Sequence, residues 1–102
     1  VRETREIIYS QKETEFNVIK YQLIKSATSV GANYQESQSA SSKADFKNKV
    51  NISLKEMAES IYWLNIISHT YNSFEQDKIR ILIQEAKELD KILGAIVKNV
   101  KA

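Results

Sequence analysis

The chain has 102 residues, with 42% hydrophobic and 27% charged side chains and a formal net charge of +2. This length allows residues 1–102 one compact domain and excludes two, and the charge is less basic than that of most nucleic-acid-binding modules. The lack of cysteine excludes disulfides and thiolate metal sites. With no proline and only two glycines, turn residues are too few for a sheet-rich fold, so the composition predicts long helices.

The first predicted helix covers residues 1–9 and has the pattern of the end of a longer helix, so we expect the segment to begin inside a longer product. Ser10 and Glu13 have the spacing of a capping box, in which the serine accepts from a backbone amide and the glutamate reaches back. A second helix is therefore predicted from Gln11 to Ser39. Its apolar stripe steps by three or four residues through Phe16, Ile19, Leu23, Ala27, Val30 and Tyr34.

Gly31 lies in the middle of this second predicted helix, where glycine destabilises by about 1 kcal/mol relative to alanine. A costly residue at such a position indicates a bend or the close approach of another backbone. We expect a facing helix to pack closely against Gly31, so that Gly31→Leu overpacks the fold.

A serine cluster at positions 37, 39, 41 and 42 interrupts the helical pattern, because serine side chains compete for backbone hydrogen bonds. Ser42 with Asp45 gives the N-terminal signal of a third helix, predicted from Lys43 to Tyr71. An i, i+4 ion pair is expected between Asp45 and Lys49.

A fourth helix is predicted after a cap formed by Ser73 with Gln76, and its apolar residues form an almost regular heptad from Ile79 to Val100. The connections are short, so neighbouring helices should run antiparallel. The sequence thus predicts an all-α, up-down-up-down four-helix bundle with a short or truncated first helix.

The last two predicted helices carry more apolar residues than one core stripe needs. Tyr62, Trp63 and Ile66 cluster within about one helical turn. A wide core stripe with a few exposed apolar residues explains them, and so does a subunit interface. We expect self-association through these three residues.

Basic residues are concentrated between Lys20 and Lys55, where six lysines face two acidic residues. Lys43, Lys47 and Lys55 follow an i, i+4 grid and predict a stripe that meets phosphates by charge alone. A solvated helix face is the alternative explanation of the same lysines.

His69 is the single histidine, and the residue three positions before it is Ile66 rather than the glutamate of a bundle di-iron site. We expect His69 to interact with the C-terminal end of a helix. The sequence predicts no catalytic residue, metal site or cofactor and no contact with a membrane.

A distinctive motif spans residues 26–36 and 42–46. It consists of a small-residue run, Ser-Val-Gly-Ala-Asn, two residues and Glu, and then Ser-Lys, a spacer and Asp-Phe. The matching positions are Ser29, Val30, Gly31, Ala32, Asn33, Glu36, Ser42, Lys43, Asp45 and Phe46. This motif resembles that of the small four-helix-bundle proteins encoded in intervening sequences of bacterial 23S ribosomal RNA genes. That family is itself similar to the accessory protein of diversity-generating retroelements.

The resemblance implies a cytoplasmic bacterial protein of largely unknown role that assembles into a ring, typically a homopentamer. Family members often have glycine where this chain has Ser37, and their first helix is longer than residues 1–9. We expect the motif to serve packing, with Asn33 and Glu36 bonding to a neighbouring helix. Two functions stay open, a non-enzymatic homo-oligomeric structural or interaction module and a weak electrostatic RNA- or DNA-binding accessory protein.

Overall fold

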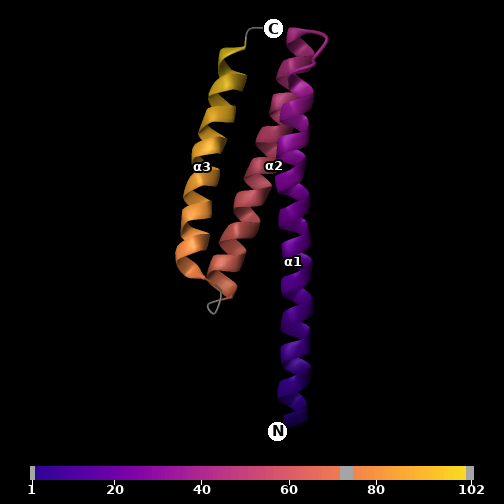
Figure 1. Ribbon diagram of the computed structural model, residues 1–102, viewed down its shortest axis with the longest axis vertical. Coiled ribbons are helices and arrows are strands. Elements are labelled where there is room, and N and C mark those ends of the chain that lie inside the picture. The colour runs from indigo at the N-terminus through magenta and orange to yellow at the C-terminus, as the bar shows by residue number, and fades with distance from the viewer. Residues whose placement is uncertain (1, 72–74, 101–102) are drawn as a thin grey trace.

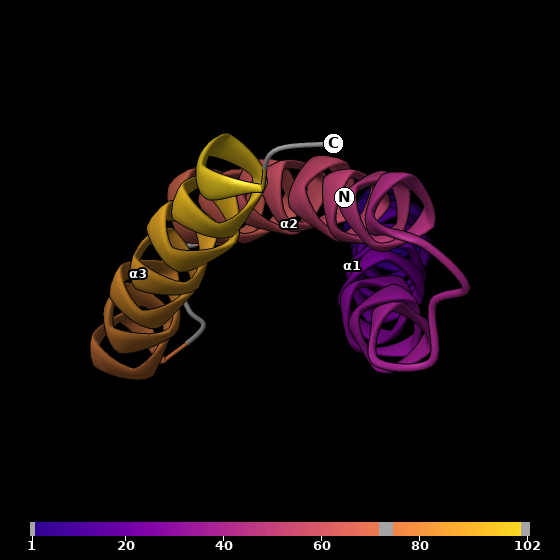
Figure 2. The same cartoon turned by 90° about the horizontal axis from the view of Figure 1, so that it is seen from above.

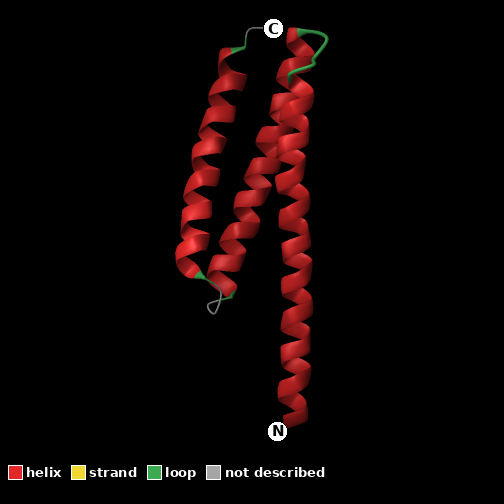
Figure 3. Cartoon of the chain, viewed as in Figure 1, coloured by secondary structure: helices red, strands yellow, loops and turns green. Residues whose placement is uncertain are grey.

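Three helices make up the described part of the chain. The computed structural model describes residues 2–71 and 75–100, with side chains from residue 13 onward. The helices are α1 (Arg2–Ser37), α2 (Lys43–Thr70) and α3 (Gln76–Asn99), and no strand occurs within these residues (Figure 3). The predicted all-α class is therefore confirmed.

The three helices form an open, elongated layer rather than a closed bundle. Each helix runs antiparallel to the next, and α2 lies between α1 and α3 (Figure 1). α1 and α3 each pack against α2, but in the described residues they do not pack against each other. Seen from above, the layer is an arch with one open side (Figure 2). The molecule measures 63 × 23 × 14 Å along its principal axes.

The predicted break at Ser10 is wrong, because α1 continues without interruption from Arg2 to Ser37. Residues 11–15 (Gln-Lys-Glu-Thr-Glu) contain neither glycine nor proline and consist mostly of good helix formers. A serine inside a helix costs only about 0.5 kcal/mol, so the Ser10–Glu13 spacing does not end the helix. The described residues hold three helices, and a four-helix bundle is not formed by them.

The other predicted boundaries agree closely with the structure. The Asp45 N–H donates to the Ser42 hydroxyl at 3.0 Å, which confirms the predicted cap of α2. α2 ends at Thr70, where the Tyr71 N–H donates to the Ile67 carbonyl. The predicted Ser73 cap lies outside the described residues.

The fully buried apolar residues come from α2 and α3. They follow the three-, four- and seven-residue steps of a helix face and comprise Val50, Met57, Leu64, Ile67, Ile79, Ala86 and Leu93. The apolar residues that α1 adds, such as Phe16, Leu23 and Val30, are only partly buried. The core is therefore a thin layer that is completed on the side of α2 but not on the open side of the arch.

Buried serines join α1 to α2. The Ser26 and Ser60 hydroxyls are 2.8 Å apart across the two helices, and Ser53 donates to the Val30 carbonyl at 2.9 Å. These three residues, called the serine seam below, are at most 4% exposed. Every buried side-chain polar atom of the described residues has a partner, so the seam avoids the cost of burying hydroxyls.

The N-terminal part of α1 extends beyond the end of α2 (Figure 1). The rings of Phe16 and Tyr71 contact at a centroid distance of 4.7 Å and mark the level at which α2 ends. Residues 2–13, called the overhang below, lie past this level and form about 18 Å of helix at 1.5 Å per residue.

Candidate helix-binding groove

An apolar groove runs along the open side of the arch, between α1 and α3 and above α2. It consists of two adjoining cavities of about 450 and 370 Å³ that share Val30, Gly31, Met57 and Leu89. Its α1 wall comprises Leu23, Ala27, Val30, Gly31 and Tyr34, and its α3 wall comprises Leu82, Glu85, Ala86, Leu89, Ile92, Leu93 and Ile96. Glu85 is the one charged residue among these lining residues.

Large apolar side chains of this groove are half exposed. The exposed fractions are 41% for Tyr34, 47% for Leu82, 49% for Leu89 and 56% for Ile92. A row of such side chains on facing helices marks a contact surface rather than scattered exposure. In a four-helix bundle the helices surround one core, and the described helices leave one corner of that arrangement open.

Gly31 lies in the α1 wall of the groove, and its surroundings correct a prediction. A Cβ built at Gly31 meets nothing within 4 Å. The expected close contact with a helix of the same chain is therefore wrong for the described residues. The reason is that the open corner of the arch, and not a helix, lies in front of this glycine.

The residues of the predicted interface, Tyr62, Trp63 and Ile66, lie together on α2 and none of them lines the groove. Tyr62 is 57% exposed, and its ring contacts the Trp63 ring edge-on at 5.0 Å. The Trp63 indole N–H donates to the Glu59 carboxylate at 3.2 Å, and Ile66 is half-buried. Self-association through this second surface stays a prediction.

The predicted lysine stripe winds around α2. Lys43 and Lys55 are exposed and Lys47 is half-buried. Twelve residues separate Lys43 from Lys55, which turns the second about 120° away from the first on an ideal helix. The three lysines therefore do not share one flat face, although each step of four residues keeps neighbours close.

Lys49 pairs across two helices instead of with Asp45. Its ammonium group contacts the Glu36 carboxylate at 2.9 Å, and this hydrogen bond with the charge of Glu36 raises the pKa of Lys49. Asp45 accepts from the Ser41 N–H at 3.2 Å, so the expected Asp45–Lys49 ion pair is not formed. The pair joins the C-terminal end of α1 to the first turns of α2.

The remaining motif residues act locally. Asn33 donates to the carbonyl and the hydroxyl of Ser29, one turn earlier in α1, at 2.9 and 3.2 Å. The expected bond from Asn33 to a neighbouring helix is therefore wrong, whereas Glu36 does reach the neighbouring helix. Phe46 packs against the core.

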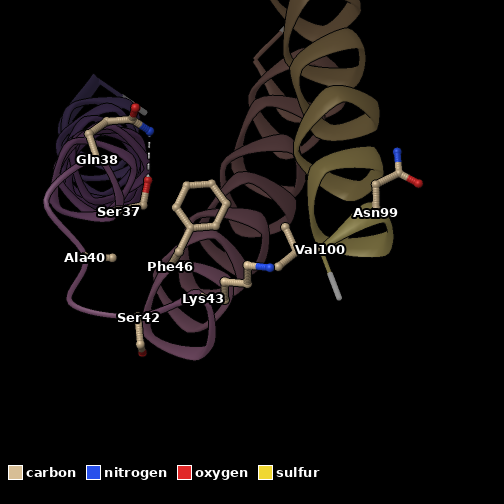
Figure 4. A pocket seen from close by; sticks show the side chains of 8 residues that line it. All are labelled: Ser37, Gln38, Ala40, Ser42, Lys43, Phe46, Asn99 and Val100. Carbon is tan, nitrogen blue, oxygen red and sulfur yellow. Dashed lines mark hydrogen bonds between the residues drawn. The ribbon is translucent and has the colours of Figure 1, made fainter. Parts of the chain in front are cut away.

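A second cavity of about 590 Å³ lies where the α1–α2 connection meets the end of α3. Figure 4 shows the Phe46 ring in the space between α1 and α2, with Lys43 extending toward Val100. Ser37, Gln38, Ala40, Ser42 and Asn99 complete the lining. The lining has hydroxyls, amides and one ammonium group but no carboxylate or imidazole, so it holds no general base.

His69 lies in the last turn of α2, as predicted, and its Nδ1 atom is 2.7 Å from the Asn65 carbonyl oxygen. Within the described residues, no three His, Cys, Asp or Glu side chains gather closely enough to hold a metal ion. Across residues 2–71 and 75–100, no helix combines the length and the apolar content that crossing a membrane requires.

Known proteins resemble this chain in both sequence and fold. The family model described as 23S rRNA-intervening sequence protein matches residues 1–95. A crystal structure from Bacteroides thetaiotaomicron, of a protein with unknown function from the S23 ribosomal protein family, is 38% identical with a TM-score of 0.75. That match covers 80% of this chain and 75% of the other chain. No curated protein matches. The chain belongs to the 23S rRNA-intervening sequence protein family.

Proposed function

We propose that the chain is a non-enzymatic, self-associating structural or interaction module, and that the groove between α1 and α3 receives a helix to complete a four-helix bundle. The exposed apolar walls of the groove are the observation that carries the proposal. Complete burial of a Leu or Ile side chain stabilises by about 1.5–3 kcal/mol. Covering the half-exposed Leu82, Leu89 and Ile92 therefore contributes about 2–5 kcal/mol toward association.

The patch of Tyr62, Trp63 and Ile66 is the second surface proposed for assembly. It offers two aromatic rings in mutual contact, outside the groove, and aromatic residues are enriched at protein interfaces. Two different surfaces on one subunit allow head-to-tail contacts, which close into a ring when the rotation between subunits permits. A homopentameric ring is the assembly proposed here.

Sedimentation equilibrium tests the role of the groove. Leu89→Glu places a charge in the α3 wall of the groove, and Ile81→Glu is the matched control because Ile81 is 57% exposed on α3 and does not line the groove. We expect the wild type and Ile81→Glu to associate and Leu89→Glu to sediment as a folded monomer. A wild type that stays monomeric at high micromolar concentration contradicts the proposal, as does equal association of both variants.

Electrostatic binding of nucleic acid by Lys43, Lys47 and Lys55 is the alternative function. Three phosphate contacts per subunit give a salt slope of about −2 to −3. Retention on RNA is measured at two salt concentrations for the wild type and for the triple Lys→Gln variant. Salt-dependent retention that the variant loses favours this alternative, whereas association without retention favours the module.

A further inference from the structure

We propose that the groove of one copy is filled by the overhang of α1, residues 2–13, from a second copy. This inference rests on the proposed function and names the segment that the groove receives. It joins two features of the same chain, a helix end that lacks a neighbouring helix and a helical layer that lacks one helix.

The overhang needs a neighbour for physical reasons. It continues α1 past the end of α2, where Figure 1 shows no other helix beside it. Isolated helices shorter than about 12–15 residues are marginal in water, because most helical stability in proteins comes from packing an apolar face. The twelve residues of the overhang therefore gain stability from a groove that supplies such packing.

The lengths of the two features match. The overhang spans about 18 Å at 1.5 Å per residue. The α3 wall from Leu82 to Ile96 extends about 21 Å, and the α1 wall from Leu23 to Tyr34 extends about 17 Å, by the same rise. One overhang thus covers the groove along most of its length.

The composition of the overhang suits an apolar groove with a charged rim. It contains three basic and three acidic residues, no glycine or proline, and the consecutive apolar residues Ile7, Ile8 and Tyr9. On the groove side, Gly31 leaves open space where an added Cβ meets nothing within 4 Å, which permits close approach of a helix backbone. Ala27, one turn earlier on the same wall, is exposed and equally small.

The occupant comes from a second copy because α1 is continuous. Ser10, near the middle of the overhang, lies about 26 Å along the helix axis from Ala27 of its own chain. A continuous helix holds its own overhang away from the groove, so the groove is filled only by the overhang of another molecule. Each chain then donates one helix segment and receives one.

Cysteine cross-linking tests this arrangement directly, since the wild-type chain contains no cysteine. Full-length Ser10→Cys is mixed with isotope-labelled full-length Ala27→Cys or with Glu85→Cys, which places a cysteine on the opposite wall. Ala58→Cys is the control, because Ala58 is as exposed as Ala27 and does not line the groove. After mild oxidation, mass spectrometry counts disulfides between labelled and unlabelled chains.

We expect at least one groove cysteine to link to Ser10→Cys several-fold more often than Ala58→Cys does, because a disulfide requires Cα atoms within about 7 Å. Equal yields for all three partners overturn the inference. An intrachain disulfide in the double variant Ser10→Cys/Ala27→Cys, at dilutions where the protein is monomeric, also overturns it, because α1 then folds back on itself. If Leu89→Glu abolishes association and no groove cysteine links to residue 10, the inference fails while the proposed function stands.

Discussion

The two sides of α1 differ in how far their contacts are completed. Toward α2, Ser26 and the Val30 carbonyl meet Ser60 and Ser53 in a closed seam in which every buried hydroxyl has a partner. Toward α3, the same helix presents Val30, Gly31 and Tyr34 to an open groove. The comparison shows that α1 packs fully against one neighbour and exposes an apolar wall to the position of another.

Chemistry separates the seam from the groove as clearly as burial does. Small hydroxyl side chains let α1 and α2 approach closely, and their hydrogen bonds replace those lost to water. The groove has large apolar side chains and few polar partners, so its stabilisation is realised only when another apolar surface covers it. Substitutions at the two sites should therefore act on different equilibria, folding at the seam and association at the groove.

The largest effect is expected from Ser53→Leu in the seam. Ser53 is fully buried and donates to the Val30 carbonyl, so leucine both overpacks the contact and removes the hydrogen bond. Overpacking alone costs about 1–3 kcal/mol, and 1 kcal/mol shifts the melting temperature of such a domain by about 4–8 °C. Thermal unfolding followed by circular dichroism should show this loss, whereas Ser39→Leu in the exposed connection should not. Equal melting of the two variants contradicts a close-packed seam.

Gly31→Leu should separate folding from association. Nothing lies within 4 Å of a Cβ at Gly31, so the monomer accepts leucine and gains up to about 1 kcal/mol from helix propensity. The larger side chain occupies the groove and should weaken association measured by sedimentation. Gly94→Leu is the matched control, because Gly94 has equally open space and does not line the groove. A melting temperature that falls at Gly31 but not at Gly94, in dilute monomer, argues for a hidden contact at Gly31.

The smallest effect is expected at the ion pair that closes the end of the seam. Glu36 raises the pKa of Lys49, and Glu36→Gln should return this pKa toward its ordinary value. Because the folded-state pKa is raised, the pair stabilises the fold at every pH below the ordinary pKa of lysine. That contribution is lost as the pH rises through the raised pKa of Lys49. Titration of the Lys49 side chain by NMR measures the shift, and an identical titration in wild type and variant contradicts the assigned cause.

Local signals in the sequence predicted α2, α3 and the connection between α1 and α2. Ser42 and Asp45 form the cap that their spacing predicts, and the heptad of α3 buries Ile79, Ala86 and Leu93 on one side. The Ser10–Glu13 signal failed because the same residues are also acceptable inside a helix. A capping box predicts a helix start only where other residues stop the preceding helix.

The seam and the groove were harder to predict because both depend on which helices lie opposite. Ser26, Ser53 and Ser60 were not recognised as core residues, although the spacing of seven between Ser53 and Ser60 places them on one helix face. Ala27, Val30 and Tyr34 were predicted to be core residues, yet they line an open groove. The sequence pattern shows which face is apolar but not whether the described chain covers it.

Small-angle X-ray scattering over a dilution series is the most direct measurement of whether another copy covers the groove. The single chain has a Cα radius of gyration of 17.4 Å and a mass of 11.7 kDa. At micromolar concentration and above we expect both the mass and the radius of gyration to exceed these values, with a return toward them on dilution and in Leu89→Glu. A mass and a radius that stay at the single-chain values at every concentration would contradict the assignment of the groove to self-association.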